Sequence, residues 1–230
     1  MPRLSVIVPV LDEARAIEAA LAPLQPCRAQ GVEVIVVDGG SADATRELAA
    51  PFADHVLRAA RGRASQMNAG AQAATGEALL FLHADTILPI DAPAMVAGAL
   101  QSGHEWGRFD VAIEGADPML ALVALLMNAR SRCSGIATGD QAIFVRRDVF
   151  GEAGGFPAIP LMEDVALSRA LRRRSPPACL RQRVLTSGRR WERQGTLRTI
   201  LRMWRLRAAY ALGADPHRLA RQYDVERTSS

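Results

Sequence analysis

The chain has 230 residues, 49% of them apolar and 23% charged, and its formal net charge at pH 7 is +4. This composition is typical of a soluble globular domain, and so mild a charge, without basic stretches interleaved with aromatic residues, argues against nucleic-acid binding. The cysteines Cys27, Cys133 and Cys179 are widely spaced, so neither a disulfide framework nor a zinc site is predicted, and a cytoplasmic location is expected.

Signals for secretion or membrane insertion are weak. The N-terminus enters a predicted strand at once, so no signal peptide is expected. The longest apolar run, residues 119–127, is much shorter than the about 20 residues that a helix needs to cross a bilayer. We expect this run to form a core helix, and an interfacial helix is the alternative.

The first 88 residues alternate between predicted strands and helices with short connections. Strands are expected at 4–10, 32–37, 55–57 and 79–82, and helices at 12–21, 42–50 and 63–74. This alternation predicts an α/β fold with a right-handed, parallel, doubly wound sheet.

The second half follows a different pattern. Helices are expected at 93–101, 118–130, 162–173 and 196–212, the last of them basic and amphipathic, and strands at 106–114, 140–146 and 180–185. The chain has no repeats and no low-complexity linker, and its last ten or so residues are expected to form a loose tail.

The apolar strand at 79–82 runs directly into His83-Ala84-Asp85. Ligands of open α/β sheets bind beyond the carboxyl ends of the strands, so the segment His83-Ala84-Asp85, called the Asp85 tip below, is predicted to lie at a ligand site. His83 and Asp85 are two residues apart and would lie on one side of an extended chain. Asp85 suits a hard divalent cation that diphosphate oxygens complete, and imidazole favours manganese over magnesium. For His83 alone, a hydrogen-bonded strand-end histidine is the alternative.

Two other strand ends carry polar turns. Asp38-Gly39-Gly40-Ser41 follows the second strand, where glycines allow a ligand to approach the backbone and Asp38 can accept hydrogen bonds from a ribose or a base. An ordinary turn capped by Ser41 is the alternative. Asp12 and Glu13 follow the first strand and would face the same crevice, or simply favour a helix start. No dinucleotide-binding or phosphate-binding glycine loop occurs.

Two polar pairs stand out in the second half. Glu163 and Asp164 begin a predicted helix. Repulsion between these adjacent carboxylates would raise the pKa of one of them, which suits a general base. The segment Arg189-Arg190-Trp191 combines two arginines, which suit phosphate binding, with a tryptophan, which can stack on a sugar or a base. The alternatives are acids at a helix start and a solvated basic turn.

In order along the chain, the segments 5–13, 34–41, 80–85, 163–164 and 190–191 resemble the successive motifs of family 2 glycosyltransferases with the GT-A fold. The His-Ala-Asp tip is most similar to a short bacterial branch labelled arsenosugar-biosynthesis glycosyltransferases. The resemblance implies a mixed, doubly wound sheet flanked by helices in one domain, residues 1–225. Residues 1–88 would form a nucleotide-binding half, and residues 89–225 an acceptor half that ends in the basic helix.

The resemblance also implies a nucleoside-diphosphate sugar donor, a divalent cation (Mn²⁺ or Mg²⁺), inversion at the anomeric carbon and roles for single residues. Asp85, with His83, would bind the metal, and Asp164, with Glu163, would supply the general base. The residues implied to contact the nucleotide are Pro9, Asp12, Glu13, Asp38, Gly39, Ser41, Arg63 and Asp85. Those implied to contact the diphosphate or the acceptor are Arg189, Arg190 and Trp191.

Two positions depart from the family pattern. His83 replaces the first acid of the D-x-D motif, which bears on the identity of the metal. Ser187 replaces the glutamine of the Q-x-x-R-W motif. That motif belongs mainly to processive synthases, so its loss favours transfer of a single sugar to an acceptor that the sequence does not identify.

Two rival functions remain. A nucleotidyltransferase of related architecture would carry a glycine-rich loop where Leu11-Asp12-Glu13 stands. A non-catalytic protein that binds a sugar nucleotide or a partner would keep the fold without the chemistry. The apolar run at 119–127 and the arginines between 198 and 207 further suggest peripheral contact with the inner face of a membrane, as for a lipid-linked acceptor. A solvated arginine-rich face is the alternative.

Overall fold

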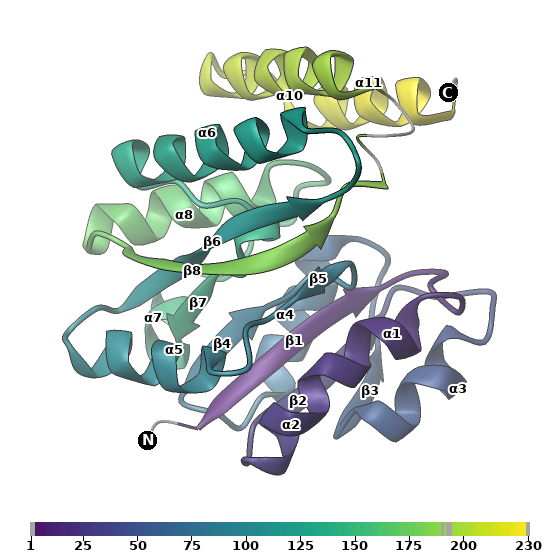
Figure 1. The fold of residues 1–230 in the computed structure, drawn as a ribbon, viewed down its shortest axis with the longest axis vertical. Helices are drawn as coiled ribbons and strands as arrows, with labels where there is room; N and C mark the ends of the chain where they lie inside the picture. The colour runs from purple at the N-terminus through teal and green to yellow at the C-terminus, as the bar shows by residue number, and fades with distance from the viewer. Residues whose placement is uncertain (1–2, 190, 192–194, 229–230) are drawn as a thin grey trace.

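The computed structural model describes residues 3–189, 191 and 195–228, and Figure 1 shows its arrangement. Its centre is one eight-stranded sheet with the order β3-β2-β1-β4-β7-β6-β8-β5. The strands are β1 (Leu4–Val10), β2 (Glu33–Asp38), β3 (His55–Arg58), β4 (Ala78–Phe81), β5 (Thr86–Ile87), β6 (Trp106–Glu114), β7 (Phe144–Arg146) and β8 (Ala178–Ser187).

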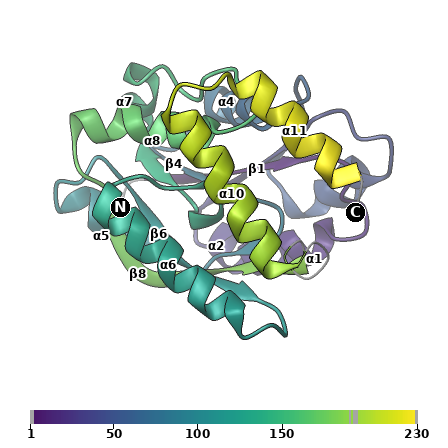
Figure 2. The same cartoon turned by 90° about the horizontal axis from the view of Figure 1, so that it is seen from above.

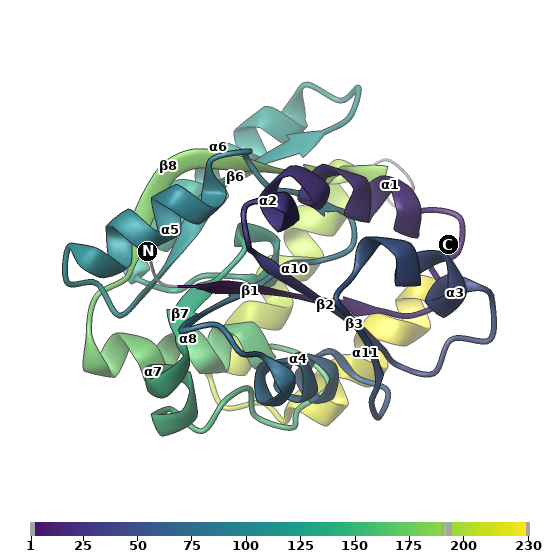
Figure 3. The ribbon, with the colours of Figure 1, turned by 90° about the horizontal axis from the view of Figure 1, so that it is seen from below.

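Helices cover both faces of the sheet. They are α1 (Ile17–Leu21), α2 (Gln25–Ala29), α3 (Thr45–Ala49), α4 (Arg63–Ala73), α5 (Ala92–Gln101), α6 (Met119–Ser134), α7 (Arg147–Glu152), α8 (Glu163–Arg174), α10 (Thr196–Ala211) and α11 (Pro216–Thr228). Figure 3 shows α1, α2 and α5 on one side of the sheet and α4, α7 and α8 on the other. The predicted doubly wound α/β architecture is therefore confirmed.

The sheet is parallel in its first half and mixed in its second. β1 pairs in parallel with β2 and with β4, and β2 pairs in parallel with β3, as predicted. β7 then lies antiparallel to both β4 and β6, and β6 pairs in parallel with β8. β4 is therefore the strand at which the two halves meet.

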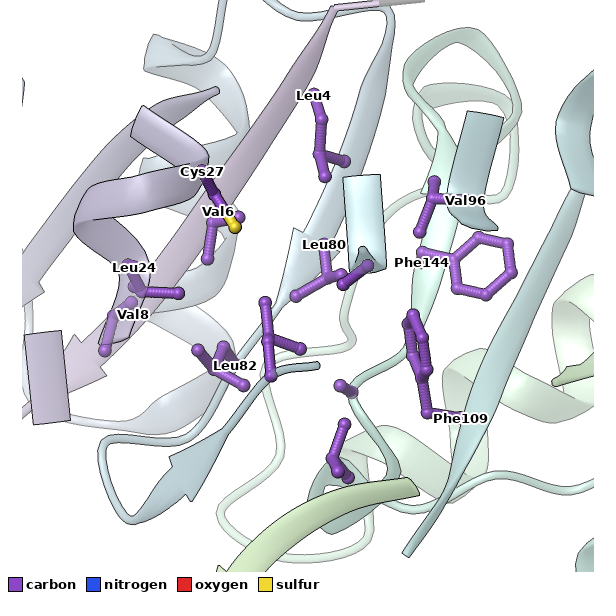
Figure 4. Close-up of a cluster of buried hydrophobic side chains, with 14 of the residues drawn as sticks. Leu4, Val6, Val8, Leu24, Cys27, Leu80, Leu82, Val96, Phe109 and Phe144 are labelled. Carbon is purple, nitrogen blue, oxygen red and sulfur yellow. The ribbon is translucent and has the colours of Figure 1, made fainter. Parts of the chain in front are cut away.

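The apolar strands fill two cores, one on each face of the sheet. Val6 and Val8 of β1 pack into the cluster beneath α1, α2 and α5, whereas Ile7 between them packs into the cluster beneath α4. Leu80 and Leu79 of β4 divide in the same way, and Figure 4 shows Val6, Val8 and Leu80 in the first cluster. A strand buried on both faces needs the continuous apolar run that the sequence shows.

Glu33 interrupts the apolar run of β2 and is nevertheless buried. Its carboxylate accepts hydrogen bonds from the Ser5 hydroxyl, the Thr75 hydroxyl and the Thr75 N–H. Burial alone would raise the pKa of Glu33, but these hydrogen bonds outweigh burial and lower it. The Glu33 carboxylate therefore connects the beginnings of β1 and β2 to the residues that follow α4.

Three predicted elements differ from those observed. The first helix begins at Ile17 rather than at residue 12, because Asp12 has a positive φ of 54° and its carboxylate binds the Ala42 N–H. The strand expected at 140–146 is reduced to β7 by a 3₁₀ turn, η3 (Gly139–Gln141), which a Thr138–Gln141 capping box stabilises. The expected loose tail is wrong, since α11 occupies most of it.

The last two helices pack at one end of the sheet. Figures 1 and 2 show α10 and α11 together there, with α6 beside α10. A small cluster of Met162, Val165, Leu206 and Leu219 anchors them on α8. On α6 the face with Leu120 and Val123 is buried, as expected of a core helix, whereas Leu122, Leu125 and Leu126 are exposed. Among the described residues, no helix is long and apolar enough to span a membrane.

A buried charge network joins β6 to α6. The fully buried guanidinium of Arg108 pairs with Asp110, whose other carboxylate oxygen pairs with Arg132. Arg108 also donates to the backbone carbonyl of Asn128. The side chain of Asn128 in turn bonds the N–H and the C=O of Val111. One carboxylate thus neutralises a guanidinium that has no access to water.

We predict that Asp110→Asn lowers the free energy of unfolding by about 3–5 kcal/mol, because breaking a buried ion pair leaves an uncompensated charge. Denaturant unfolding measures the change. Asp148→Asn is the matched control, since the Arg146–Asp148 pair is about half exposed and exposed pairs contribute only about 0–1 kcal/mol. Equal destabilisation by the two substitutions would contradict the role given to Asp110.

Candidate active site

A cavity of about 430 Å³ opens at the carboxyl end of the sheet. One wall is made of strand ends and carries His83, Asp85 and Ser187, and the opposite walls are α6 and α10. Of the other predicted site residues, Arg63, Arg189 and Trp191 also line this cavity. The structure therefore brings together residues that lie more than 100 positions apart in the sequence.

The loops after β1 and β2 are fastened to each other. The Asp12 N–H donates to the Ser41 hydroxyl at 2.9 Å, and the Asp12 carboxylate accepts the Ala42 N–H at 2.8 Å. Asp38 is fully buried, and its carboxylate accepts the N–H groups of Gly40 and Ser41. The atoms that this turn presents to solvent are therefore those of Gly40 and Ser41 rather than the Asp38 carboxylate.

Gln66 is a buried residue of this region that the sequence reasoning missed. Its side-chain amide donates to the carbonyls of Val10 and Val37, at the ends of β1 and β2, and its amide carbon and oxygen pack against Gly39. A Cβ on Gly39 would lie 3.0 Å from the Gln66 side-chain oxygen. Gln66 is the polar residue among the buried positions of α4, which are otherwise small or apolar.

Glu13 connects these loops electrostatically to the Asp85 tip. The pKa of Glu13 is raised, first by burial and then by the negative charge of Asp85, while Arg189 opposes the shift. Pro9 lies half-buried in β1 just before these loops. Glu13, Asp85 and Arg189, which follow β1, β4 and β8, thus influence one another at the carboxyl end of the sheet.

The imidazole of His83 is packed between protein groups. Its Nδ1 lies 3.3 Å from a carboxylate oxygen of Asp140, and a Cβ on Gly139 would lie only 2.4 Å from its Cε1 and Nε2 atoms. Only glycine permits this contact. Asp140, which also lines the cavity, was expected within a strand and was missed as a site residue.

The acidic pair Glu163–Asp164 begins α8, directly after the positive φ of 69° at Met162. Burial, followed by the Asp164 charge, raises the pKa of Glu163 to about 7. The Asp164 carboxylate accepts the Gly139 N–H at 2.8 Å and its neighbour Val165 N–H at 2.7 Å. Asp164 therefore lies next to the η3 turn whose Asp140 lines the cavity.

Ser187, which stands where the family motif has glutamine, supports a different residue. Its hydroxyl accepts hydrogen bonds from the Arg189 backbone N–H at 3.3 Å and from Arg189 Nε at 3.1 Å. The Ser187 N–H donates to the backbone carbonyl of Asp85 at 3.0 Å, which fixes the end of β8 against the Asp85 tip. The predicted Arg190 lies outside the described residues.

The metal-binding side chains of this site can hold a divalent cation only if atoms of a bound ligand complete its coordination. Among the residues that the structure describes, no group of three His, Cys, Asp or Glu side chains could bind a metal by itself. Asp85 presents an exposed carboxylate in the cavity, and His83 already contacts Asp140 and Gly139. One carboxylate fits Mg²⁺ or Mn²⁺ when phosphate oxygens and water complete the coordination.

The raised pKa of Glu163 predicts a pH-dependent stability. The folded state holds this proton up to about pH 7, whereas the unfolded chain releases it near the ordinary glutamate pKa of 4.5, so stability falls as pH rises between these values. Glu163→Gln removes the effect. In thermal unfolding, we expect the stability of Glu163→Gln relative to wild type to increase as the pH is raised from 5 to 8. A difference in stability that does not vary with pH would contradict this.

Comparisons with known proteins agree with this geometry. Residues 5–122, more than half of the chain, match the profile of Glycosyl transferase family 2. A PGL/p-HBAD biosynthesis glycosyltransferase of Mycobacterium tuberculosis is 32% identical over 170 residues, which cover 67% of this chain and 63% of the relative. The chain thus spans less than two thirds of that relative. An uncharacterized glycosyltransferase of Nostoc is 29% identical over 92 residues, covering 37% of this chain and 29% of the relative.

Solved structures show the same fold at low identity. Staphylococcus aureus TarS 1–349 with UDP-GlcNAc superposes with a TM-score of 0.66 and 17% identity, covering 80% of this chain and 58% of TarS. The mannosyltransferase PcManGT of Pyrobaculum calidifontis, with GDP-Man and Mn²⁺, gives a TM-score of 0.61 and 22% identity, covering 80% and 56%. With the profile match and the strand-end site, they lead to one conclusion: the chain has the GT-A fold and belongs to glycosyl transferase family 2.

Proposed function

We propose that the protein transfers a single sugar from a nucleoside-diphosphate sugar to an acceptor hydroxyl, with inversion at the anomeric carbon. The observation that carries this proposal is the convergence of Asp85, Arg189 and the Asp164 turn around one cavity. This arrangement would bring a donor site, a diphosphate site and a base within reach of one substrate pair. Family membership and neighbours solved with UDP-GlcNAc or GDP-Man and Mn²⁺ support the same reading.

The nucleotide would occupy the loops after β1 and β2. Pro9, Asp12 and Glu13 border this crevice together with the exposed part of the Gly39–Ser41 turn. Because the two loops are hydrogen-bonded to each other, the site is formed before any ligand arrives, which reduces the entropy lost on binding. Asp38 and Gln66 would position these loops from beneath.

The diphosphate would lie between Asp85 and Arg189. A divalent cation bound there by Asp85 would neutralise charge on the departing nucleoside diphosphate. Arg189 is oriented by Ser187 and would donate hydrogen bonds to the same phosphate oxygens. Trp191 and Arg63 line the same cavity and would border the sugar or the acceptor.

Asp164 would remove the proton from the acceptor hydroxyl. Its two backbone hydrogen bonds hold the carboxylate in one orientation beside the η3 turn. Glu163, buried behind it, would act on Asp164 through charge rather than touch the substrate. A positioned base of this kind contributes about 10²–10⁴-fold to a rate.

Exposed apolar side chains support peripheral contact with a membrane. Leu122, Leu125 and Leu126 of α6 and Leu201 and Trp204 of α10 are exposed, and Leu126 and Trp204 also line the cavity. With the arginines of α10 they would suit an anionic lipid surface. We expect the protein to sediment with anionic liposomes and the double variant Leu201→Ser/Trp204→Ser to stay in the supernatant. Failure of the wild-type protein to sediment would end this proposal.

Binding of the donor is the first test of the function. We expect one nucleoside diphosphate in a calorimetric panel to bind in a manganese-dependent manner. In Asp85→Ala the affinity should fall by at least about tenfold, because even changes beyond the direct ligands weaken metal sites by about 10–100-fold. Binding of no nucleotide by wild type would favour the rival partner protein.

Turnover tests the base. Asp164→Asn should slow release of nucleoside diphosphate from the sugar donor by about 10²–10⁴-fold while donor affinity changes little. The exposed Asp148→Asn serves as a control for the loss of one carboxylate. Equal turnover in wild type and Asp164→Asn would remove Asp164 from the mechanism. Pyrophosphate release from a nucleoside triphosphate and a sugar phosphate would instead identify the rival nucleotidyltransferase.

A further inference from the structure

The cavity continues beyond the strand ends into a cleft between α6 and α10. Arginines from both helices line this cleft, among them Arg130 from α6 and Arg207 from α10. Their neighbours in the lining are largely apolar and include Leu126, Met127, Ile200 and Met203. Guanidinium groups are rarely placed among such side chains without an anionic partner.

Arg130 and Arg207 keep donors that have no partner. The Nε and Nη2 atoms of Arg130 and the Nε atom of Arg207 are buried, and no described protein atom accepts a hydrogen bond from them. An unmet donor on a charged group is costly, because the group has lost water and gained nothing in return. Within the described part of the chain, two side chains that line the cleft thus carry three donor nitrogens without a partner.

The two arginines also repel each other. Burial lowers the pKa of Arg130 to about 10, and the positive charge of Arg207, which lines the same cavity, is the next cause. The Asp164 charge acts in the opposite direction but is the weaker effect. A bound anion would meet the free donors and cancel the repulsion at once.

We propose that Arg130 and Arg207 form a binding site for a phosphate group of the acceptor. The two positive charges match a phosphate monoester, which carries about −1.5 to −2 at neutral pH, better than a carboxylate with its single charge. The proposal rests on the proposed function only in naming the acceptor as the owner of this phosphate. The acceptor hydroxyl would then lie toward Asp164, whose charge Arg130 senses.

The phosphate has two sources that share this chemistry. It belongs either to an amphiphile whose apolar chain lies along Leu126, Ile200 and Met203, or to a small phosphorylated sugar or alcohol. The apolar lining, which includes the exposed side chains of Leu126 and Trp204, favours the amphiphile. The two sources differ in how strongly an alkyl chain contributes to binding.

The test is calorimetric titration of the full chain, without metal, with inorganic phosphate and with dodecyl phosphate below its micelle concentration. We expect one phosphate per chain, bound about 10–100-fold more weakly by Arg130→Gln and by Arg207→Gln, the effect of losing hydrogen bonds to a charged group. Arg173→Gln, an exposed arginine of α8, is the control for the loss of one positive charge. Dodecyl phosphate binding at least about tenfold tighter than phosphate identifies the amphiphile, and equal affinity identifies the small acceptor.

A second measurement guards against misfolded variants. Phosphate should raise the thermal midpoint of wild type, Arg173→Gln and Arg189→Gln, and leave that of Arg130→Gln unchanged. The site is overturned if wild type binds neither phosphate, or if both cleft variants bind phosphate as tightly as wild type. Loss of binding in Arg189→Gln also overturns it, because the anion would then occupy the donor site. Nucleotide titrations on the same proteins report on the proposed function separately.

Discussion

The contact between His83 and Gly139 is the constraint on which the cavity depends. β4 carries His83 out of the parallel half, and the η3 turn carries Gly139 in from the mixed half. The imidazole lies where any Cβ would be, so the two halves approach more closely here than another residue would allow. The same glycine donates its N–H to Asp164. One close approach thus sets the separation between the Asp85 tip and the candidate base.

Charge is distributed unevenly around this contact. Asp85 and Asp140 line the cavity on the side of the strand ends, where the Asp85 charge also acts on Glu13, whereas α6 and α10 contribute Arg130 and Arg207. The cation and diphosphate proposed above would suit the first side, and an anionic acceptor would suit the second. Burial, followed by the charge of Asp85, raises the pKa of Glu13, and burial, followed by the charge of Arg207, lowers the pKa of Arg130. Ligands of opposite charge would offset the repulsion on both sides.

Backbone conformation at single residues directs several of these side chains. Asp12 and Met162 both have positive φ angles, which cost energy in residues other than glycine and recur at functional sites. Asp12 turns the chain so that the loops after β1 and β2 bond each other, and Met162 begins α8 with Glu163 and Asp164. These angles have no signature in residue type, which explains why the helix expected from residue 12 began later.

The sequence alone determined the parallel half of the sheet and its polar tips. Runs such as Ile7 to Val10 and 79–82 are apolar at every position, which only a strand buried on both faces requires, and Asp38 and Asp85 follow where such strands end. Tertiary structure decided the rest. Contacts between residues distant in sequence decide the burial of Asp38, the packing of His83, the support given by Gln66 and the convergence of Arg130 and Arg207 on one cavity. Local periodicity carries no information about such contacts.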